Sequence, residues 1–318
     1  MRVIRSRAPV RICDNGGWTD TWFSRHGAVF HIAVAPYVSV TLTVGLSGRP
    51  EVVAPVTPLV EAALSAARLP LTRVVVDVAC DVPPGSGTGT SAAVAVALLG
   101  ALAVLDGQPA EPATIAAAAH RLEVETLGQE SGIQDQLASA YGGINYVEMP
   151  EYPAAVVTAL HPPEPTVREL DARLILLYLG RPHESSAVHA QVIRGLVGEG
   201  AASPRLERLR AVAARSRDAV VRGDLDELGR AMIANCDAQA ALHPALVSGD
   251  ARRVIDVARR SGAAGWKVNG AGGEGGSMTL LAGPDTRDEV VDAILGVDPT
   301  FKVIPIQVGA EGLRVWEL

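Results

Sequence analysis

The longest apolar segment of the chain, residues 92–105, consists of alanine, valine, leucine and glycine and follows a glycine-rich turn. Its length suits a buried core helix and is too short to cross a bilayer. The preceding segment 73–80 (RVVVDVAC) is rich in β-branched residues and predicts a strand that leads into the turn. Strand, turn and helix therefore form one unit, around which we expect the chain to be organised.

Similar patterns predict further elements in the first half of the chain. They are a strand at 2–11, two neighbouring strands within 27–44 broken at Pro36, a short helix at 58–68, a helix at 113–127 broken by Gly128, and a strand at 143–149. Prolines at 150, 153, 162, 163 and 165 then crowd one region, and they disfavour continued regular structure. We place a domain boundary there, between residues 1–160 and 161–318.

The second half is predicted to begin with an apolar strand at 172–179. Four helices should follow, at 186–197, 204–222, 225–241 and 250–261. The chain then reads as strand, glycine turn, strand, helix and strand between residues 265 and 308. No repeat at solenoid spacing is present in this pattern.

The composition narrows the class of protein. Of the 318 residues, 48% are hydrophobic and 20% charged, which favours a well-packed protein over a disordered one. The net charge of -7 argues against a general nucleic-acid binder. We expect neither a membrane span nor a secretion signal, and the three widely spaced cysteines (Cys13, Cys80, Cys236) suggest neither zinc ligands nor a redox centre. A reducing cytoplasm fits these features best.

The turn before the apolar helix has glycines at alternate positions, Gly85, Gly87 and Gly89, followed by Thr90 and Ser91. Glycines let the backbone approach a ligand closely, and a helix N-terminus presents free N–H groups and a positive dipole end. The pattern therefore predicts an anion cradle. It lacks the lysine of a P-loop and the spacing of a dinucleotide motif. The alternative interpretation is a glycine turn before a buried helix.

Two other stretches are candidates for chemistry. Gly270, Gly272 and Gly275 match Gly-x-Gly-x-x-Gly formally, but a strand-like segment follows where a dinucleotide site needs a helix. A glycine hairpin close to another backbone or to a ligand is the better interpretation. Separately, Glu123 on a helix and Asp135 beyond a glycine turn could converge on a magnesium ion and a substrate hydroxyl. Solvated carboxylates at a helix end are the alternative.

Three motifs together resemble one superfamily, the GHMP small-molecule kinases. The loop at 83–93 (PPGSGTGTSAA) is similar to its central phosphate loop, 7–12 (RAPVRI) with 16–20 (GGWTD) to its N-terminal motif, and 270–276 to its C-terminal glycine motif. Thr88 and Thr90 replace a usual leucine and serine, and Glu274 replaces a usual glycine. With 132–136 (GIQDQ) and 141–145 (YGGIN), the motifs look most like the heptose 7-phosphate kinase and fucokinase branch.

The resemblance implies an α+β fold of two domains, one like ribosomal protein S5 domain 2 and one ferredoxin-like, with the active site between them. The helix, strand, strand, helix, strand order from 250 to 308 is compatible with the second. It also implies ATP, Mg²⁺ and a sugar or sugar-phosphate acceptor, phosphorylated on its anomeric hydroxyl. A monomer or homodimer is expected.

The resemblance also assigns roles to residues. Asp135 would accept or orient the proton of the attacking hydroxyl, with Arg11 as the cation beside it, and Ser91 and Glu123 would hold Mg²⁺. The nucleotide phosphates would lie against Pro84, Gly85, Ser86, Gly87, Thr88, Gly89, Thr90 and Ser91. The substrate side would comprise Gly17, Thr19, Asp20, Arg181, Ser185, Gly272 and Gly273. A polar strand-to-helix turn capped by Ser185 or Ser186 is an equal alternative for that segment.

Several points stay open at this level. If the acceptor is a sugar 7-phosphate, Arg25, Arg181 or Lys267 should bind its distal phosphate. Trp18 is either a sugar platform or a buried turn residue. A helix carries Asn235, Gln239 and His243 at helical spacing, facing either the cleft or solvent. The alternative functions are a kinase of another polyol, a uronic acid or a cyclitol, and a non-catalytic sensor of sugar or nucleotide.

Overall fold

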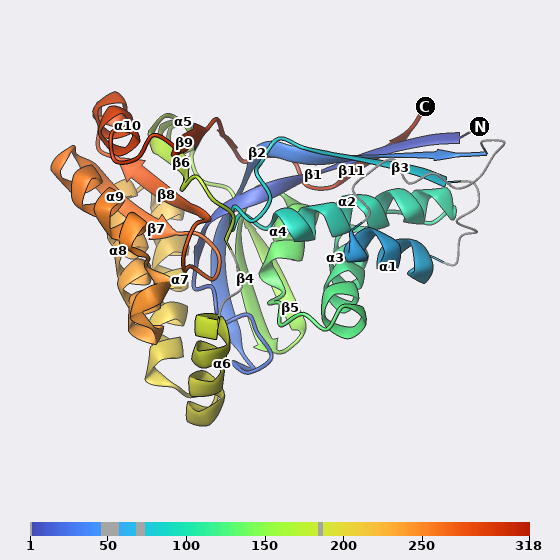
Figure 1. Cartoon of the computed structure of the whole chain (residues 1–318), viewed down its shortest axis with the longest axis horizontal. Coiled ribbons are helices and arrows are strands. Elements are labelled where there is room, and N and C mark those ends of the chain that lie inside the picture. The colour runs from blue at the N-terminus through green and yellow to red at the C-terminus, as the bar shows by residue number, and fades with distance from the viewer. Residues whose placement is uncertain (1, 46–56, 68–73, 184–186) are drawn as a thin grey trace.

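An antiparallel sheet organises the N-terminal part of the protein in the computed structural model, which describes residues 2–45, 57–67, 74–183 and 187–318. Within those residues the sheet has seven strands in the order β11-β1-β2-β4-β5, with β3 and β10 also pairing with β2. The strands are β1 (Arg2–Asn15), β2 (Gly27–Val44), β3 (Val74–Cys80), β4 (Ile144–Glu151), β5 (Ala154–Leu160), β10 (Gln307–Val308) and β11 (Arg314–Glu317). The final strands therefore return from the far end of the chain to join the first ones (Figure 1).

One strand differs from its prediction. We expected two strands within 27–44, but β2 is continuous across Pro36. Pro9 pairs with Tyr37 and Val10 with Val34, so Ala35 and Pro36 form an irregularity in the ladder with β1. A proline lacks the N–H of a ladder and is tolerated at such a bulge, so the strand is not interrupted.

Helices pack against this sheet on the right-hand side of Figure 1. They are α1 (Pro58–Ala66), α2 (Thr90–Leu105), α3 (Pro112–Arg121) and α4 (Gln134–Tyr141). The apolar segment of the sequence is α2, which packs against β1 and β2 through small residues such as Ala93, Ala97 and Ala101. The predicted helix 113–127 is instead α3 followed by a π-helical segment, Leu122–Thr126. That segment carries Glu123, and π-helical turns often mark functional sites.

The second half contains a smaller antiparallel sheet with the order β7-β8-β6-β9. Its strands are β6 (Leu174–Tyr178), β7 (Ala263–Val268), β8 (Ser277–Ala282) and β9 (Lys302–Ile304). The helices are α5 (Glu164–Arg173), α6 (Ala187–Glu199), α7 (Pro204–Arg222), α8 (Leu225–Leu242), α9 (Gly249–Arg260) and α10 (Arg287–Leu295). The succession β6, α9, β7, β8, α10, β9 with this strand order is ferredoxin-like, as predicted.

The proline-rich region contains more regular structure than the sequence predicted. It holds the hairpin β4–β5 and the helix α5, and Pro165 occupies the first turn of that helix. A proline is well placed there, because the N–H it lacks would have no partner within the helix. The predicted boundary near residue 160 stays a prediction, and α5 begins immediately after it. Among the described residues, none of the helices combines the length and apolar character needed to cross a membrane.

Candidate active site

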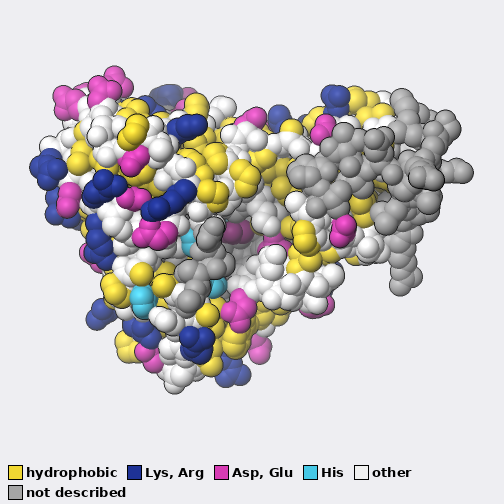
Figure 2. Space-filling model, viewed as in Figure 1, with side chains coloured by type: hydrophobic (Ala, Val, Ile, Leu, Met, Phe, Trp, Pro, Cys, Tyr) yellow, Lys and Arg dark blue, Asp and Glu magenta, His cyan; other side chains and the backbone are white. Residues whose placement is uncertain are grey.

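A cavity of about 340 Å³ lies where the two halves of the chain meet. Figure 2 shows it as a hollow near the centre of the molecule, with acidic side chains inside. Its walls come from the end of β1 and the turn after it, from the glycine loop and start of α2, and from residues 129–136. The second half contributes His183, His189, Gly270 and Ala271. The predicted glycine loop and both predicted carboxylates therefore border one space.

The glycine loop takes a conformation that side chains would obstruct. Gly85, Gly87 and Gly89 have φ values of +69°, +73° and +73°, in the region that favours glycine. A Cβ on Gly85 would lie 2.7 Å from Pro182, and one on Gly89 would lie 3.3 Å from the Cγ of Asp135. Gly89 also precedes the first turn of α2 with no side-chain cap, so the loop leads directly to free helix N–H groups. The loop therefore has the conformation that the predicted anion cradle requires, and its binding of an anion stays a prediction.

Hydroxyl groups lie beneath the loop. The Ser86 Oγ lies 2.6 Å from the Thr88 Oγ1, and the Thr90 Oγ1 lies 3.3 Å and 3.2 Å from these two atoms. Ser86 and Thr88 are fully buried. The two threonines that depart from the family pattern therefore form a hydrogen-bonded cluster that supports the backbone of the loop.

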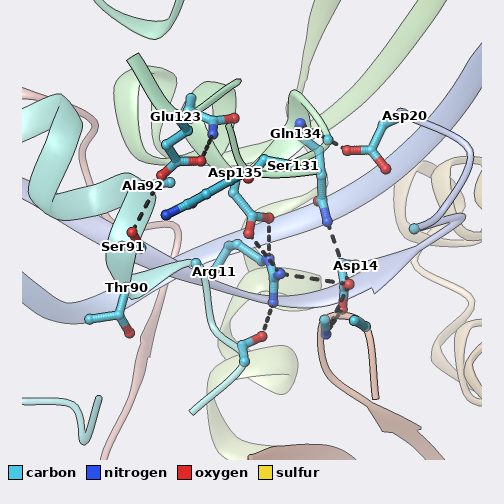
Figure 3. Close-up of a pocket in the computed structure, with 18 of the residues that line it drawn as sticks. Arg11, Asp14, Asp20, Thr90, Ser91, Ala92, Glu123, Ser131, Gln134 and Asp135 are labelled. Carbon is cyan, nitrogen blue, oxygen red and sulfur yellow. Dashed lines mark hydrogen bonds and ion pairs between the residues drawn. The ribbon is translucent and has the colours of Figure 1, made fainter. Parts of the chain in front are cut away.

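Arg11 joins the loop to Asp135. Its Nε and Nη2 atoms donate to the two carboxylate oxygens of Asp135 at 2.9 Å and 3.1 Å, and its Nη1 donates to the carbonyl of Gly87. Burial of Arg11 would lower the pKa of its guanidinium, but the carboxylates of Asp135 and Asp14 outweigh burial and raise it. Arg11 is thus a permanent cation that orients Asp135 beside the phosphate cradle (Figure 3).

A second buried ion pair supports the first. Asp14, from the same strand as Arg11, lies 2.8 Å from the Nζ of Lys267 on β7, and both side chains are 1% exposed. The Asp14 carboxylate also accepts the N–H of Gly270 and lies 3.8 Å from Arg11. Burial would raise the pKa of Asp14, but Arg11 and Lys267 hold it below its usual range. Asp14 therefore remains ionised and links β1 to the C-terminal glycine motif.

Ser91 and Glu123 meet on the side of Asp135 away from Asp20 (Figure 3). The Ser91 Oγ donates to Glu123 Oε1 at 3.4 Å, and Gln136 Nε2 donates to Glu123 Oε2 at 2.6 Å. Burial and the nearby Asp135 raise the pKa of Glu123 to about 7. Among the described residues no cation lies within ion-pair distance of this carboxylate. A buried carboxylate and a hydroxyl form an oxygen donor set, which fits Mg²⁺.

Asp20 lies on the opposite side of the cavity, and only 4% of it is exposed. Its Oδ2 accepts the N–H of Gln134 at 3.1 Å. Burial, with a further contribution from Asp135, raises the pKa of Asp20 to about 6. Gly132 passes so close that a Cβ there would lie 2.0 Å from the Asp20 carboxylate. The backbone at Gly132 therefore leaves no room for a side chain beside the Asp20 carboxylate.

Several residues predicted to bind the substrate or the nucleotide phosphates lie outside the cavity lining, and their roles stay predictions. Thr19 is fully buried, and its hydroxyl bonds the backbone of Gly16 and Ala28. Arg181 forms ion pairs with Asp250 and Glu274. Gly272 and Gly273 pack against Leu246 instead, and Pro84 and Thr88 also lie outside the lining. Ser185 lies outside the described residues, whereas Gly17 lines the cavity as predicted.

The residues left open by the sequence can also be placed. Trp18 is both buried and in the cavity lining, with its ring 4.8 Å from that of His189. Asn235 accepts the N–H of Gly16, and Gln239 donates to the carbonyl of Gly270, so these two side chains support the backbone of the site. His243 instead accepts the N–H of Ala245.

Sequence reasoning missed several polar residues of the site, among them Asp14, Gln134 and Gln136. The two glutamines flank Asp135 in the first turn of α4, a helix that was not predicted. One bonds Asp20 through its backbone N–H, and the other bonds Glu123 through its side chain. Asp14 stands in the turn-rich stretch 14–20, but its partner Lys267 is 253 positions away in sequence and carries no local signal.

Comparison with known families gives two matches. Residues 58–143 match the GHMP kinases N terminal domain, and residues 216–296 match the GHMP kinases C terminal domain. Among characterised relatives, a D-glycero-alpha-D-manno-heptose 7-phosphate kinase of Campylobacter jejuni is 26% identical over 67% of this chain and 62% of its own length. A mevalonate kinase of Thermococcus onnurineus is 32% identical over 77% of this chain and 70% of its own length.

The same fold occurs in solved structures. A D-glycero-D-manno-heptose 1-phosphate kinase from Bacteroides thetaiotaomicron superimposes with a TM-score of 0.79 over 98% of both chains, at 24% identity. A galactokinase from Lactococcus lactis superimposes with a TM-score of 0.73 over 98% of this chain and 95% of its own, at 15% identity. These likenesses confirm the predicted two-domain fold.

Proposed function

The chain belongs to the GHMP kinase family, whose members transfer a phosphoryl group to a hydroxyl, and we propose that it phosphorylates a sugar or sugar phosphate with ATP, on the anomeric hydroxyl. The main observation that supports this proposal is that the Arg11–Asp135 pair borders the same cavity as the glycine loop at the start of α2. The likeness to heptose phosphate kinases supports a sugar acceptor.

The residues divide the work of phosphoryl transfer. The N–H groups at the glycine loop and α2 would bind the nucleotide phosphates. Asp135 would accept the proton of the acceptor hydroxyl while the hydroxyl oxygen attacks the γ-phosphorus and ADP leaves. Arg11 holds Asp135 in place and neutralises charge on the transferred group. Ser91 and Glu123 would hold Mg²⁺, which neutralises phosphate charge when bound. Asp20 would bind acceptor hydroxyls.

The test is ADP release from ATP and MgCl₂ with a panel of acceptors: hexoses, heptoses, their terminal phosphates, uronic acids, cyclitols and mevalonate. The proposal predicts ADP formation that depends on a sugar acceptor, with a product whose ³¹P spectrum shows an anomeric phosphate. ADP release only with a non-sugar acceptor would contradict the sugar assignment. Ligand binding by calorimetry without turnover of any acceptor would contradict catalysis. We also infer a cytoplasmic monomer or homodimer, which fractionation and sedimentation would test.

A further inference from the structure

We propose that the acceptor carries no negative charge: an uncharged sugar or polyol, rather than a sugar phosphate, a uronate or another carboxylate. The inference rests on the proposed function and deepens it by naming the class of substrate. It depends on the charges that border the cavity and on where the basic side chains of the chain actually lie.

The lining of the cavity, as far as the described residues show it, contains a single lysine or arginine side chain, Arg11. All three donor-bearing nitrogens of that side chain are engaged, two by Asp135 and one by the carbonyl of Gly87. A second carboxylate, that of Asp14, lies 3.8 Å away. Arg11 therefore lies at Asp135 and the glycine loop, where it would act on the transferred phosphoryl group rather than on a distal phosphate of the acceptor.

The three basic residues that could have bound such a phosphate lie elsewhere. Lys267 is 1% exposed and pairs with Asp14, so an anion cannot reach it without breaking that pair. Arg181 pairs with Asp250 and Glu274, outside the cavity lining. Arg25 is exposed and also outside the lining. None of the three candidates is in a position to neutralise an acidic acceptor.

The charges that do border the acceptor side are negative. Asp20 lines the cavity on the side of Asp135 away from Ser91 and Glu123 (Figure 3). Glu130 also lines the cavity and interacts electrostatically with His189 of the lining. Burial and the neighbouring Asp135 raise the pKa of Asp20 to about 6, so Asp20 and Asp135 already act on each other as like charges in this region. A phosphate or carboxylate placed here would meet like charges in a partly buried site, and like-charge contact disfavours a ligand strongly.

Weaker positive groups do not reverse this balance. His189 lines the cavity, but burial and the neighbouring His183 lower its pKa, so its imidazole is neutral near pH 7. The helix α6, which carries His189, begins at Ala187 near the cavity, and a helix N-terminus is equivalent to about half an elementary charge. The full charges of Asp20 and Glu130 exceed it.

The same lining suits a neutral polyol. Carboxylates accept hydrogen bonds from hydroxyl groups, and the two oxygens of Asp20 offer more acceptor sites than the N–H of Gln134 occupies. The rings of Trp18 and His189, 4.8 Å apart, give the cavity an aromatic wall for the apolar face of a sugar ring. Uncharged hydroxyls and C–H groups thus find partners where an anionic group finds none.

The experiment compares matched pairs that differ only in charge: D-glycero-D-manno-heptose with its 7-phosphate, and D-galactose with D-galacturonate. kcat/KM is measured by ADP release, and binding by calorimetry without ATP. We expect the uncharged member of at least one pair to exceed its charged partner by about 100-fold in kcat/KM. A charged member that is turned over or bound more tightly than its uncharged partner would overturn the inference. Binding of uncharged members alone, without turnover, would refute the kinase proposal and uphold this inference.

A charge reversal at the cavity sharpens the test. Glu130→Arg should reduce the preference for the uncharged member roughly tenfold, because it adds a cation to the acceptor side. Glu289→Arg on α10 makes the same change on the exposed surface outside the lining and serves as the control. Equal ratios in both variants and the wild type would show that cavity charge does not set the preference and would count against the inference.

Discussion

The ammonium group of Lys267 lies 2.8 Å from the carboxylate of Asp14, and each side chain is 1% exposed. The two residues come from different halves of the chain, one from β1 and the other from β7. Asp14 also accepts the N–H of Gly270 and lies 3.8 Å from Arg11, the partner of the proposed catalytic carboxylate. Because Lys267 neutralises Asp14, Arg11 is left to pair with Asp135.

Breaking this pair should be costly. Lys267→Met removes one partner and leaves a buried carboxylate, and we expect the free energy of unfolding to fall by about 3 kcal/mol. Asp14→Asn should cost a similar amount, since it leaves a buried ammonium. The double variant should be more stable than the sum of the two losses predicts. Urea denaturation of the four proteins measures this coupling, and strictly additive losses would show that the pair is not a unit.

Gly89 is expected to limit activity through Asp135. Gly89→Ala places a Cβ 3.3 Å from the Asp135 Cγ and imposes a positive φ, so we expect about 1–2 kcal/mol lower stability and a loss in kcat of about tenfold or more. Gly107→Ala is the matched control, because Gly107 has φ +75° but nothing within 4 Å of the added Cβ. It should lose similar stability and keep its kcat. An equal kcat in both variants would show that the close approach of Gly89 to Asp135 does not affect activity, and would contradict this prediction.

The protonation of Asp20 should make the free energy of unfolding depend on pH. Folding raises the pKa of this carboxyl from 3.8 to about 6, so the native state binds its proton more tightly than the unfolded state. The resulting stabilisation, about 3 kcal/mol, is present below pH 4 and is lost as the pH rises through 6. Subtracting the unfolding free energies of Asp20→Asn from those of the wild type isolates this term. A flat difference between pH 4 and 7 would contradict the assignment.

Ser91 should set the requirement for the metal. Ser91→Ala removes one of two predicted oxygen ligands, and the Mg²⁺ concentration for half-maximal ADP release should rise about 10-fold or more. Ser91→Thr keeps the hydroxyl and is the control. If both variants needed the wild-type concentration of Mg²⁺, the ion would have to bind elsewhere.

Local patterns were enough to predict most of the elements. The helix predicted at 204–222 matches α7 at both ends, because Ser203 caps its start, Pro204 is its first residue and Gly223 directly follows its last one. The short helix α4 was missed, since its eight residues lack a clear apolar period and begin without a side-chain cap. The strand β11 was also missed, because it is short and depends on pairing with β1.

The residues of the site could be predicted where they belong to a sequence motif of the family. The glycine loop, Arg11 and Asp135 lie together as the family resemblance implied. Arg181 was assigned to the cavity from its place after a strand, but nearby carboxylates on other elements hold it at the surface. The Asp14–Lys267 pair could not be inferred, because only the fold brings these positions together.

The most direct test of the account compares acceptor-dependent ADP formation by the wild type and by Asp135→Asn. The asparagine keeps the size of the side chain but cannot accept the hydroxyl proton as a carboxylate does, so kcat should fall by about 10²–10⁴-fold. ATP binding by calorimetry and the circular dichroism spectrum should stay close to those of the wild type. Turnover at the wild-type rate in this variant would contradict the central claim that Asp135 acts on the acceptor hydroxyl.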